Sequence, residues 1–142
     1  MEVREILERV RTIAIVGASR NPNKDAGMVP RYLKENGYRI VPINPVAEEI
    51  AGEKAYPSLS DLPGEIASII DAVDVFRPPS EAMKIVEDAS RLREKYGKPW
   101  LIWFQYGTHT VEAVEEAKKR GFIVVYDRCM MEEHRRHFKK NY

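Results

Sequence analysis

Short, almost continuous apolar runs alternate along the chain with longer amphipathic stretches. The runs lie at residues 13–16, 40–43, 69–76, 100–104 and 122–126. Runs of this length, with little polar alternation, are typical of strands that are covered on both faces. The pattern therefore predicts five buried strands.

The stretches between these runs have the spacing of amphipathic helices. Val3, Ile6, Leu7 and Val10 lie at i, i+3, i+4 and i+7 and form one apolar stripe. Thr110 is the expected N-cap of a later helix, whose first turns are acidic and whose last turn is basic. That order of charges complements the helix dipole.

Other segments between the runs are placed by their prolines and their apolar spacing. A helix is expected to follow Ser80 and to turn its apolar side chains toward the sheet. Because a proline is excluded from a helix interior, we expect the helix around Pro30 to begin close to Met28, after a loop from Gly17 to Gly27. Residues 45–63 are predicted to form mainly a loop, with a short helical turn near Ser60.

Three predicted helices end at a glycine that can adopt a positive φ before the chain enters the next strand. These residues are Gly37, Gly97 and Gly121. The repeated order of helix, glycine and strand predicts an α/β fold, in which right-handed crossovers place helices on both faces of a parallel sheet. We therefore expect one domain over residues 1–142, a Rossmann-like three-layer sandwich with a five-stranded parallel sheet in the order 3-2-1-4-5.

Composition narrows the functional classes. With 23 Lys and Arg against 22 Asp and Glu, the formal charge of +1 gives no general attraction for nucleic acid or an anionic membrane. No apolar run approaches the roughly 20 residues that span a bilayer. The single cysteine, Cys129, excludes an internal disulfide framework, so we expect a cytoplasmic protein. Because the charge favours neither nucleic acid nor a membrane, we expect its partner to be a small molecule.

Small residues, hydrogen-bonding groups and arginines gather at the ends of the predicted strands. The candidate binding residues are Gly17, Ala18, Ser19 and Arg20; Asn44 and Pro45; Phe76, Arg77 and Pro78; and Gln105, Tyr106 and Gly107. Ligands of open α/β sheets bind outside the carboxyl ends of the strands. The first cluster suits a phosphate, because Gly17 permits a close backbone approach and Ser19 and nearby amides can donate hydrogen bonds. An ordinary tight turn between strand and helix would have the same sequence.

The same residues weaken the case for NAD. The dinucleotide fingerprint GxGxxG would have its second glycine where this chain has Ser19, and the second strand ends in Asn44-Pro45 without a carboxylate for the ribose. The phosphate-binding pattern GxxxxGK[ST] does not occur in the sequence.

Six short segments, in the same order along the chain, resemble the small stand-alone CoA-binding proteins, a family similar to the N-terminal domain of the succinyl-CoA synthetase alpha subunit. They are Gly17–Ser19, Tyr38–Pro45, Tyr56–Leu59, Asp74–Pro78, Trp103–Gly107 and Tyr126–Cys129. The resemblance spans about Ile13 to His134. It implies a Rossmann-like domain with coenzyme A, or an acyl-CoA, lying across the strand ends.

The resemblance also implies roles for the candidate residues. Residues 17–20 correspond to the phosphate-side loop, Asn44 and Pro45 to the wall beside the nucleotide, and residues 76–78 to the phosphate or pantetheine side. Residues 105–107 correspond to a further part of the site. The segment Phe104-Gln105-Tyr106 departs from the family, where leucine-like residues flank the glutamine.

These features favour a CoA-binding carrier, sensor or regulatory module that has no catalytic site of its own. A small enzyme acting on acyl-CoA through Cys129 or His109 is the alternative, and an NAD(P)-binding switch is a weaker one. Cys129, His134 and His137 do not have the spacing of a zinc site. A protein partner or a second copy of the chain remains open, and the resemblance does not imply ligase activity.

Overall fold

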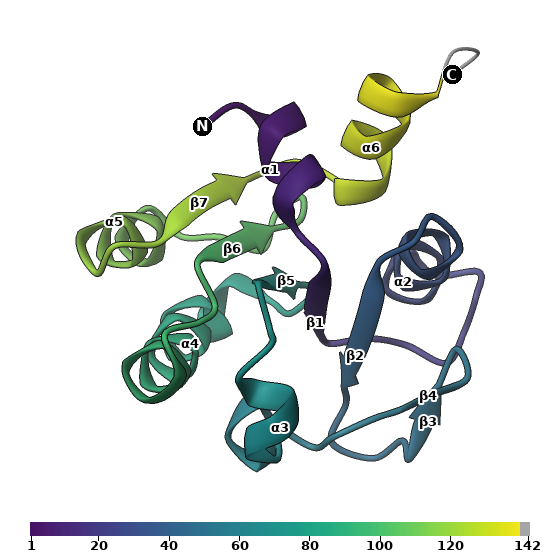
Figure 1. Ribbon diagram of the computed structural model, residues 1–142, viewed down its shortest axis with the longest axis horizontal. Helices are drawn as coiled ribbons and strands as arrows, with labels where there is room; N and C mark the ends of the chain where they lie inside the picture. The colour runs from purple at the N-terminus through teal and green to yellow at the C-terminus, as the bar shows by residue number, and fades with distance from the viewer. Residues whose placement is uncertain (140–142) are drawn as a thin grey trace.

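Five parallel strands form the central sheet in the computed structural model, which describes residues 1–139 (Figure 1). The strands are β1 (Thr12–Val16), β2 (Arg39–Ile43), β5 (Ala72–Val75), β6 (Leu101–Phe104) and β7 (Ile123–Tyr126). They coincide with the five apolar runs of the sequence. The last residues of the predicted domain, 140–142, lie outside the described part of the chain.

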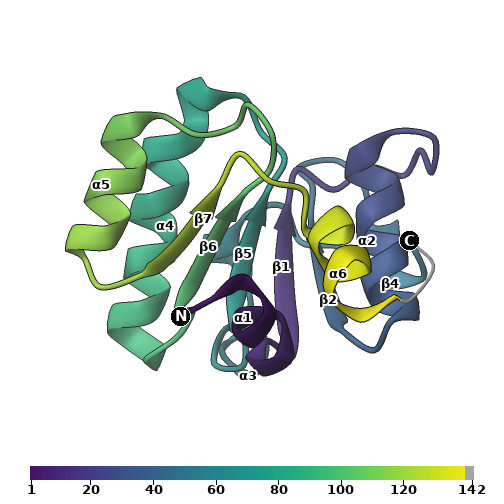
Figure 2. The same cartoon turned by 90° about the horizontal axis from the view of Figure 1, so that it is seen from above.

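Helices cover both faces of this sheet (Figure 2). One face carries α1 (Val3–Arg9), α2 (Asp25–Glu35) and α6 (Met130–Phe138), and the other carries α3 (Gly64–Ala67), α4 (Ala82–Tyr96) and α5 (Val111–Lys119). The connections contain the strands β3 (Glu49–Ile50) and β4 (Glu53–Lys54) and the short 3-10 helices η1 (Leu59–Asp61) and η2 (Pro79–Glu81). The predicted Rossmann-like three-layer fold is confirmed. Within residues 1–139, no helix combines the length and apolar character needed to cross a membrane.

The order of the strands differs from the expected 3-2-1-4-5. The sheet runs β2-β1-β5-β6-β7, so the third main strand pairs with the first and not with the second. A segment at Tyr56 occupies the outer edge of β2, where its amide donates to the Pro42 carbonyl and its carbonyl accepts from the Asn44 amide, both at 3.0 Å. Asp71 fixes the start of β5 beside β1 through two hydrogen bonds. Its amide donates to the Thr12 carbonyl at 2.9 Å, and its carboxylate accepts from the Thr12 amide at 3.1 Å. The chain adds β2 on one side of β1 and the later strands on the other, so the order of strands reverses between β1 and β5.

Helix α2 begins at Asp25, three residues before the expected start, and contains Pro30 in its interior. Proline has no N–H for the carbonyl of Ala26, four residues earlier. The Ser19 amide donates to that carbonyl instead, at 2.9 Å. The loop after β1 thus supplies the hydrogen bond that the proline removes. Other local predictions are confirmed, because Thr110 caps α5 and the three helix-ending glycines all have positive φ.

Asp74 lies in the middle of β5 and is completely buried. In register it stands between Ile15 of β1 and Trp103 of β6, both of which belong to the apolar core beneath α1, α2 and α6. Neither carboxyl oxygen has a hydrogen-bond partner among residues 1–139. Burial raises the pKa of Asp74 well above its ordinary value.

We predict that Asp74→Val increases the free energy of unfolding by about 1–3 kcal/mol at neutral pH, because it replaces a buried, unpaired polar group with an apolar side chain. The folded-state pKa lies above that of the unfolded chain. The carboxyl group therefore costs least below pH 4 and progressively more as the pH rises through the folded-state pKa. The stability difference between variant and wild type should widen from pH 4.5 to pH 8, as measured by urea denaturation.

The variant Asp74→Asn is the control for this titration. It keeps the polar atoms but does not ionise, so its stability should lack the part of the pH dependence that Asp74 contributes. An Asp74→Val protein that is clearly less stable than wild type at pH 8 would show that the carboxyl group has a stabilising partner.

Candidate functional site

A cleft of about 290 Å³ opens at the carboxyl edge of the sheet, beside the point where the chain reverses direction. The ends of β1 and β2, the segment before η1, and the start of α4 form its walls. Its lining residues are Val16, Gly17, Ile43, Asn44, Pro45, Pro57, Ser58, Leu59, Arg77, Glu81, Lys84, Ile85 and Asp88. Four of the predicted binding residues, Gly17, Asn44, Pro45 and Arg77, meet in this cleft.

Gly17 ends β1 with a φ of +93°. A Cβ atom at this position would lie 2.8 Å from Cδ of Arg77 and 3.1 Å from the backbone carbonyl carbon and oxygen of Phe76. Both the backbone conformation and the available space therefore require glycine. Because the glycine has no side chain, the chain after β5 can approach the end of β1 closely.

The rest of the loop after β1 is held by internal hydrogen bonds. The Ser19 amide donates to Ala26, and its hydroxyl oxygen accepts from the Asn21 amide at 3.0 Å. The Arg31 guanidinium donates to the carbonyls of Gly27 (2.7 Å) and Arg20 (3.1 Å). The Ser19 amide is therefore already bonded within the loop, and the Ser19 hydroxyl proton is the donor that this residue can offer to a phosphate.

Asn44 joins the loops that follow β1 and β2. Its Nδ2 donates to the carbonyl of Ala18 at 2.9 Å, and its Oδ1 accepts from the amides of Val46 and Ala47, each at 2.8 Å. The side chain therefore fixes the cleft wall that includes Pro45. Ala18, whose side chain is buried, contributes to this wall only through its carbonyl.

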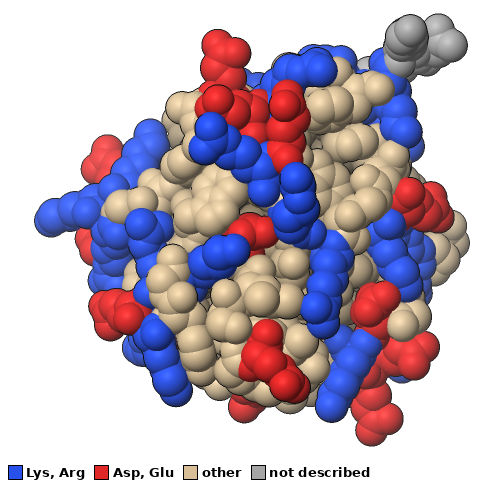
Figure 3. All heavy atoms as spheres, in the orientation of Figure 1, with Lys and Arg blue, Asp and Glu red and all other residues tan. Residues whose placement is uncertain are grey.

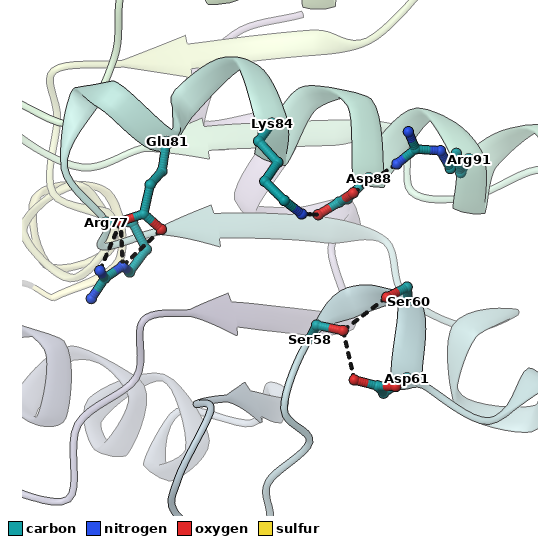
Figure 4. Close-up of polar contacts among 8 residues, drawn as sticks. All are labelled: Ser58, Ser60, Asp61, Arg77, Glu81, Lys84, Asp88 and Arg91. Atoms are coloured by element: carbon teal, nitrogen blue, oxygen red, sulfur yellow. Dashed lines mark hydrogen bonds and ion pairs between the residues drawn. The ribbon is translucent and has the colours of Figure 1, made fainter.

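Two cations and two carboxylates alternate along the α4 side of the cleft (Figure 4). Arg77 donates to both carboxylate oxygens of Glu81, with closest distances of 3.2 Å to Oε1 and 2.7 Å to Oε2. Lys84 contacts Asp88 at 3.0 Å, and Asp88 also accepts from Arg91 at 2.8 Å. The bonds from Arg77 lower the pKa of Glu81, so this carboxylate is ionised at neutral pH. The four charges that line the cleft sum to zero.

The opposite wall carries hydroxyl groups and apolar side chains. Ser58 bonds to both Ser60 and Asp61, at 2.8 Å and 2.7 Å (Figure 4). Pro57 and Leu59 extend this wall and face a cleft that Ile85 of α4 also lines. A ligand in the cleft would thus meet charges on one side and a mainly apolar surface on the other.

The remaining predicted residues lie outside the lining of this cleft. Phe76 packs against the core under α1, α2 and α6, and Arg20 and Pro78 are exposed. The segment 105–107 contacts the region between β7 and α6, since Oε1 of Gln105 accepts from the Met130 amide at 3.0 Å and the Gly107 amide donates to Asp127 at 3.1 Å. These residues share the carboxyl edge of the sheet with the cleft but not its walls.

A family model described as a CoA binding domain matches residues 11–135. The chain belongs to this family. The matched range includes all five strands of the sheet and every residue that lines the cleft.

The chain is similar both to proteins of about its own length and to short parts of larger enzymes. It is 33% identical to the "Uncharacterized protein YneT" of Bacillus subtilis, over 94% of this chain and 92% of the relative. It is 31% identical to an ADP-forming acetate–CoA ligase of Methanocaldococcus jannaschii, over 84% of this chain but only 17% of the ligase. A solved structure of a hypothetical protein from Pyrococcus horikoshii is 44% identical, covers 94% of this chain and 88% of its own, and has a TM-score of 0.84.

The two residues considered for catalysis have different surroundings. Cys129 is buried, and this burial raises the pKa of its thiol, which disfavours the reactive thiolate. The His109 ring packs against Tyr126 with a centroid distance of 4.9 Å, and its Nδ1 is buried without a hydrogen-bond partner in the described chain. Within residues 1–139, no hydrogen bond connects Cys129 and His109.

Sequence reasoning missed the contribution of α4 and of the segment before η1. The i, i+4 spacing of Arg77 with Glu81 and of Lys84 with Asp88 indicates ion pairs. It does not reveal which cavity they face. Ser58 lies in a segment that resembles the family but carries no chemical motif of its own. Its place in the cleft depends on the path of residues 44–71 past the edge of β2.

Comparing alanine substitutions at two glycines tests the close approach at Gly17. Gly17 and Gly37 have nearly equal φ values of +93° and +96°, but a Cβ at Gly37 has no neighbour within 4 Å. Alanine at such a φ costs about 1–2 kcal/mol. We predict this loss for Gly37→Ala and a further loss of at least about 1 kcal/mol for Gly17→Ala, measured by chemical denaturation. Equal losses would mean that Arg77 and Phe76 move away from the new Cβ without any loss of stability.

Proposed function

We propose that this protein binds coenzyme A, or an acyl-CoA, at the carboxyl edge of its sheet and acts as a carrier, sensor or regulatory module without a catalytic site of its own. The observation that carries this proposal is the cleft beside the reversal point, where Gly17 and Arg77 lie in contact at the ends of β1 and β5. Ligands of open α/β folds occupy this position. The family to which the chain belongs supports coenzyme A as the ligand.

The chemistry of the cleft matches the nucleotide end of coenzyme A. Arg77 and Lys84 offer two cations for phosphate oxygens, and the guanidinium of Arg77 can form paired bonds with them. Pro45, Pro57 and Ile85 offer apolar surface for the faces of an adenine ring. Ser58 lies in the same cleft, and its hydroxyl oxygen, whose proton is donated to Asp61, can accept a hydrogen bond from a ribose hydroxyl.

The cleft is smaller than the whole ligand. Its volume of about 290 Å³ is at the lower end of ligand pockets. Coenzyme A has an adenosine, three phosphates and a pantetheine arm. We therefore assign the nucleotide to the cleft and the pantetheine arm to the neighbouring strand ends, past Phe76 toward Gln105, Tyr106 and Gly107. In this arrangement Ser19 and Arg20 lie on the phosphate side.

The residues beside β2 argue against NAD as the preferred ligand. NAD-binding domains place a carboxylate at the end of the second strand, where it holds the ribose hydroxyls. Here that position is Asn44, whose amide group is already bonded to Ala18, Val46 and Ala47. A dinucleotide also lacks the pantetheine arm that would use the remaining strand ends.

We do not assign the activity of the related ligases to this chain, because the chain matches only a small part of their length. The raised pKa of the Cys129 thiol gives no support to an acyl-CoA enzyme that uses this residue as its nucleophile. A cytoplasmic location stays a prediction.

The ligand assignment predicts an order of affinities. Coenzyme A should bind more tightly than dephospho-CoA by about 10- to 100-fold, because the lost 3′-phosphate gives up a charge-assisted hydrogen bond of about 1.5–3 kcal/mol. NAD should bind more weakly still. Calorimetric titration of the three ligands at one fixed salt concentration measures this order. Equal affinity for NAD and coenzyme A would overturn the assignment.

A second prediction locates the phosphates. Arg77→Gln should weaken coenzyme A binding about tenfold, since it removes one charge-assisted contact. Arg120→Gln is the matched control, because Arg120 also pairs with a glutamate four residues away but lies at the end of α5, outside the cleft. If the two substitutions changed the affinity equally, Arg77 would not be a residue that contacts the ligand.

A further inference from the structure

We propose that Glu81 is a built-in counter-ion that competes with the ligand's phosphates for Arg77, and that Asp88 does the same for Lys84, so that the cleft selects ligands with several phosphate groups over single phosphates. This inference rests on the proposed function, because it concerns the same cleft. It adds a role in specificity for two carboxylates that a phosphate-binding site would not otherwise be expected to contain.

The geometry of the first pair supports direct competition. Arg77 directs Nε and one terminal nitrogen of its guanidinium toward the carboxylate of Glu81, with the closest contact at 2.7 Å (Figure 4). A phosphate bound through paired hydrogen bonds would use the same donors. Arg77 must therefore release Glu81, wholly or in part, before it binds a phosphate in this way.

The second pair differs in what remains after Lys84 is released. Asp88 also accepts a hydrogen bond from Arg91, so it stays paired when Lys84 turns toward a ligand (Figure 4). Glu81 forms side-chain hydrogen bonds with Arg77 alone in the described part of the chain. Releasing Arg77 therefore leaves Glu81 without a hydrogen-bonded partner beside the incoming phosphate, with Lys84 as its nearby opposite charge, and Glu81 is the stronger competitor.

The energetic balance explains the selectivity. Exposed ion pairs contribute little net stability, and the side chains of Arg77 and Glu81 are 46% and 42% exposed. Exchanging a carboxylate for a single phosphate therefore gains little, because one anion replaces another. A ligand with linked phosphates reaches both Arg77 and Lys84 in one binding event and adds the apolar contacts of the cleft, so only such a ligand gains enough to displace both carboxylates.

The test compares Glu81→Gln with wild type by calorimetric titration of inorganic phosphate, inorganic pyrophosphate and coenzyme A at fixed salt. The substitution keeps the size of the side chain and removes its charge. We expect tighter binding of pyrophosphate and coenzyme A by about two- to tenfold, in line with the small net strength of exposed pairs. Inorganic phosphate should gain by a similar factor, since it displaces the same carboxylate, and both proteins should prefer pyrophosphate, which reaches Lys84 as well.

The matched control is Glu116→Gln, which breaks the corresponding i, i+4 pair with Arg120 on α5, outside the cleft. It should leave all three affinities unchanged. The resonance of the Arg77 Nε–H group in NMR spectra gives an independent readout, since pyrophosphate should shift it more readily in Glu81→Gln than in wild type.

The outcomes separate this inference from the proposed function. If wild type binds coenzyme A and Glu81→Gln binds it with equal or lower affinity, Glu81 is not a competing counter-ion and the proposed function stands. If wild type does not bind coenzyme A but Glu81→Gln gains affinity for pyrophosphate, the counter-ion role stands and the assigned ligand is wrong. If neither protein binds any of the three, both proposals fail.

Discussion

The close approach of two chain segments at Gly17 is the constraint on which the candidate site depends. β1 and β5 are neighbours in the sheet, and the chain leaves them in segments that would collide if residue 17 had a side chain. Its positive φ turns the backbone away from the strand, and the missing Cβ leaves room for Arg77. The place of Arg77 beside the end of β1, in the wall of the cleft, depends on this close approach.

The charges over the rest of the molecule do not select a ligand. Figure 3 shows Lys and Arg interspersed with Asp and Glu over the face that it draws, in keeping with a formal charge of +1. Recognition of an anionic ligand must therefore come from local geometry. In the function proposed above, the alternating side chains of Arg77, Glu81, Lys84 and Asp88 supply this geometry at the cleft, where their four charges sum to zero.

The sequence allowed the prediction of those features that depend on local patterns. The apolar runs located all five strands, and the helix-ending glycines and the Thr110 cap were identified from residue preferences. The strand order was wrong, because it depends on long-range contacts of Tyr56 and Asp71 that no local pattern encodes. The predicted start of α2 was wrong because Ser19 supplies the hydrogen bond that Pro30 cannot.

The sequence pointed to only some of the residues that line the cleft. Gly17 and Asn44 were singled out because they follow predicted strands, whereas Ser58, Lys84 and Asp88 reach the cleft only through the tertiary path of the chain.

An NMR titration of isotope-labelled protein with coenzyme A tests the proposed binding site most directly, because it reports the location of binding as well as its strength. We expect the largest shifts at the Gly17 amide, the Ser58 amide and the Arg77 Nε–H group. We expect little change at Ser90 and Arg120, which line a different hollow between α4 and α5. Shifts confined to that second hollow, or a spectrum unchanged at saturating coenzyme A, would contradict the claim that this cleft binds the ligand.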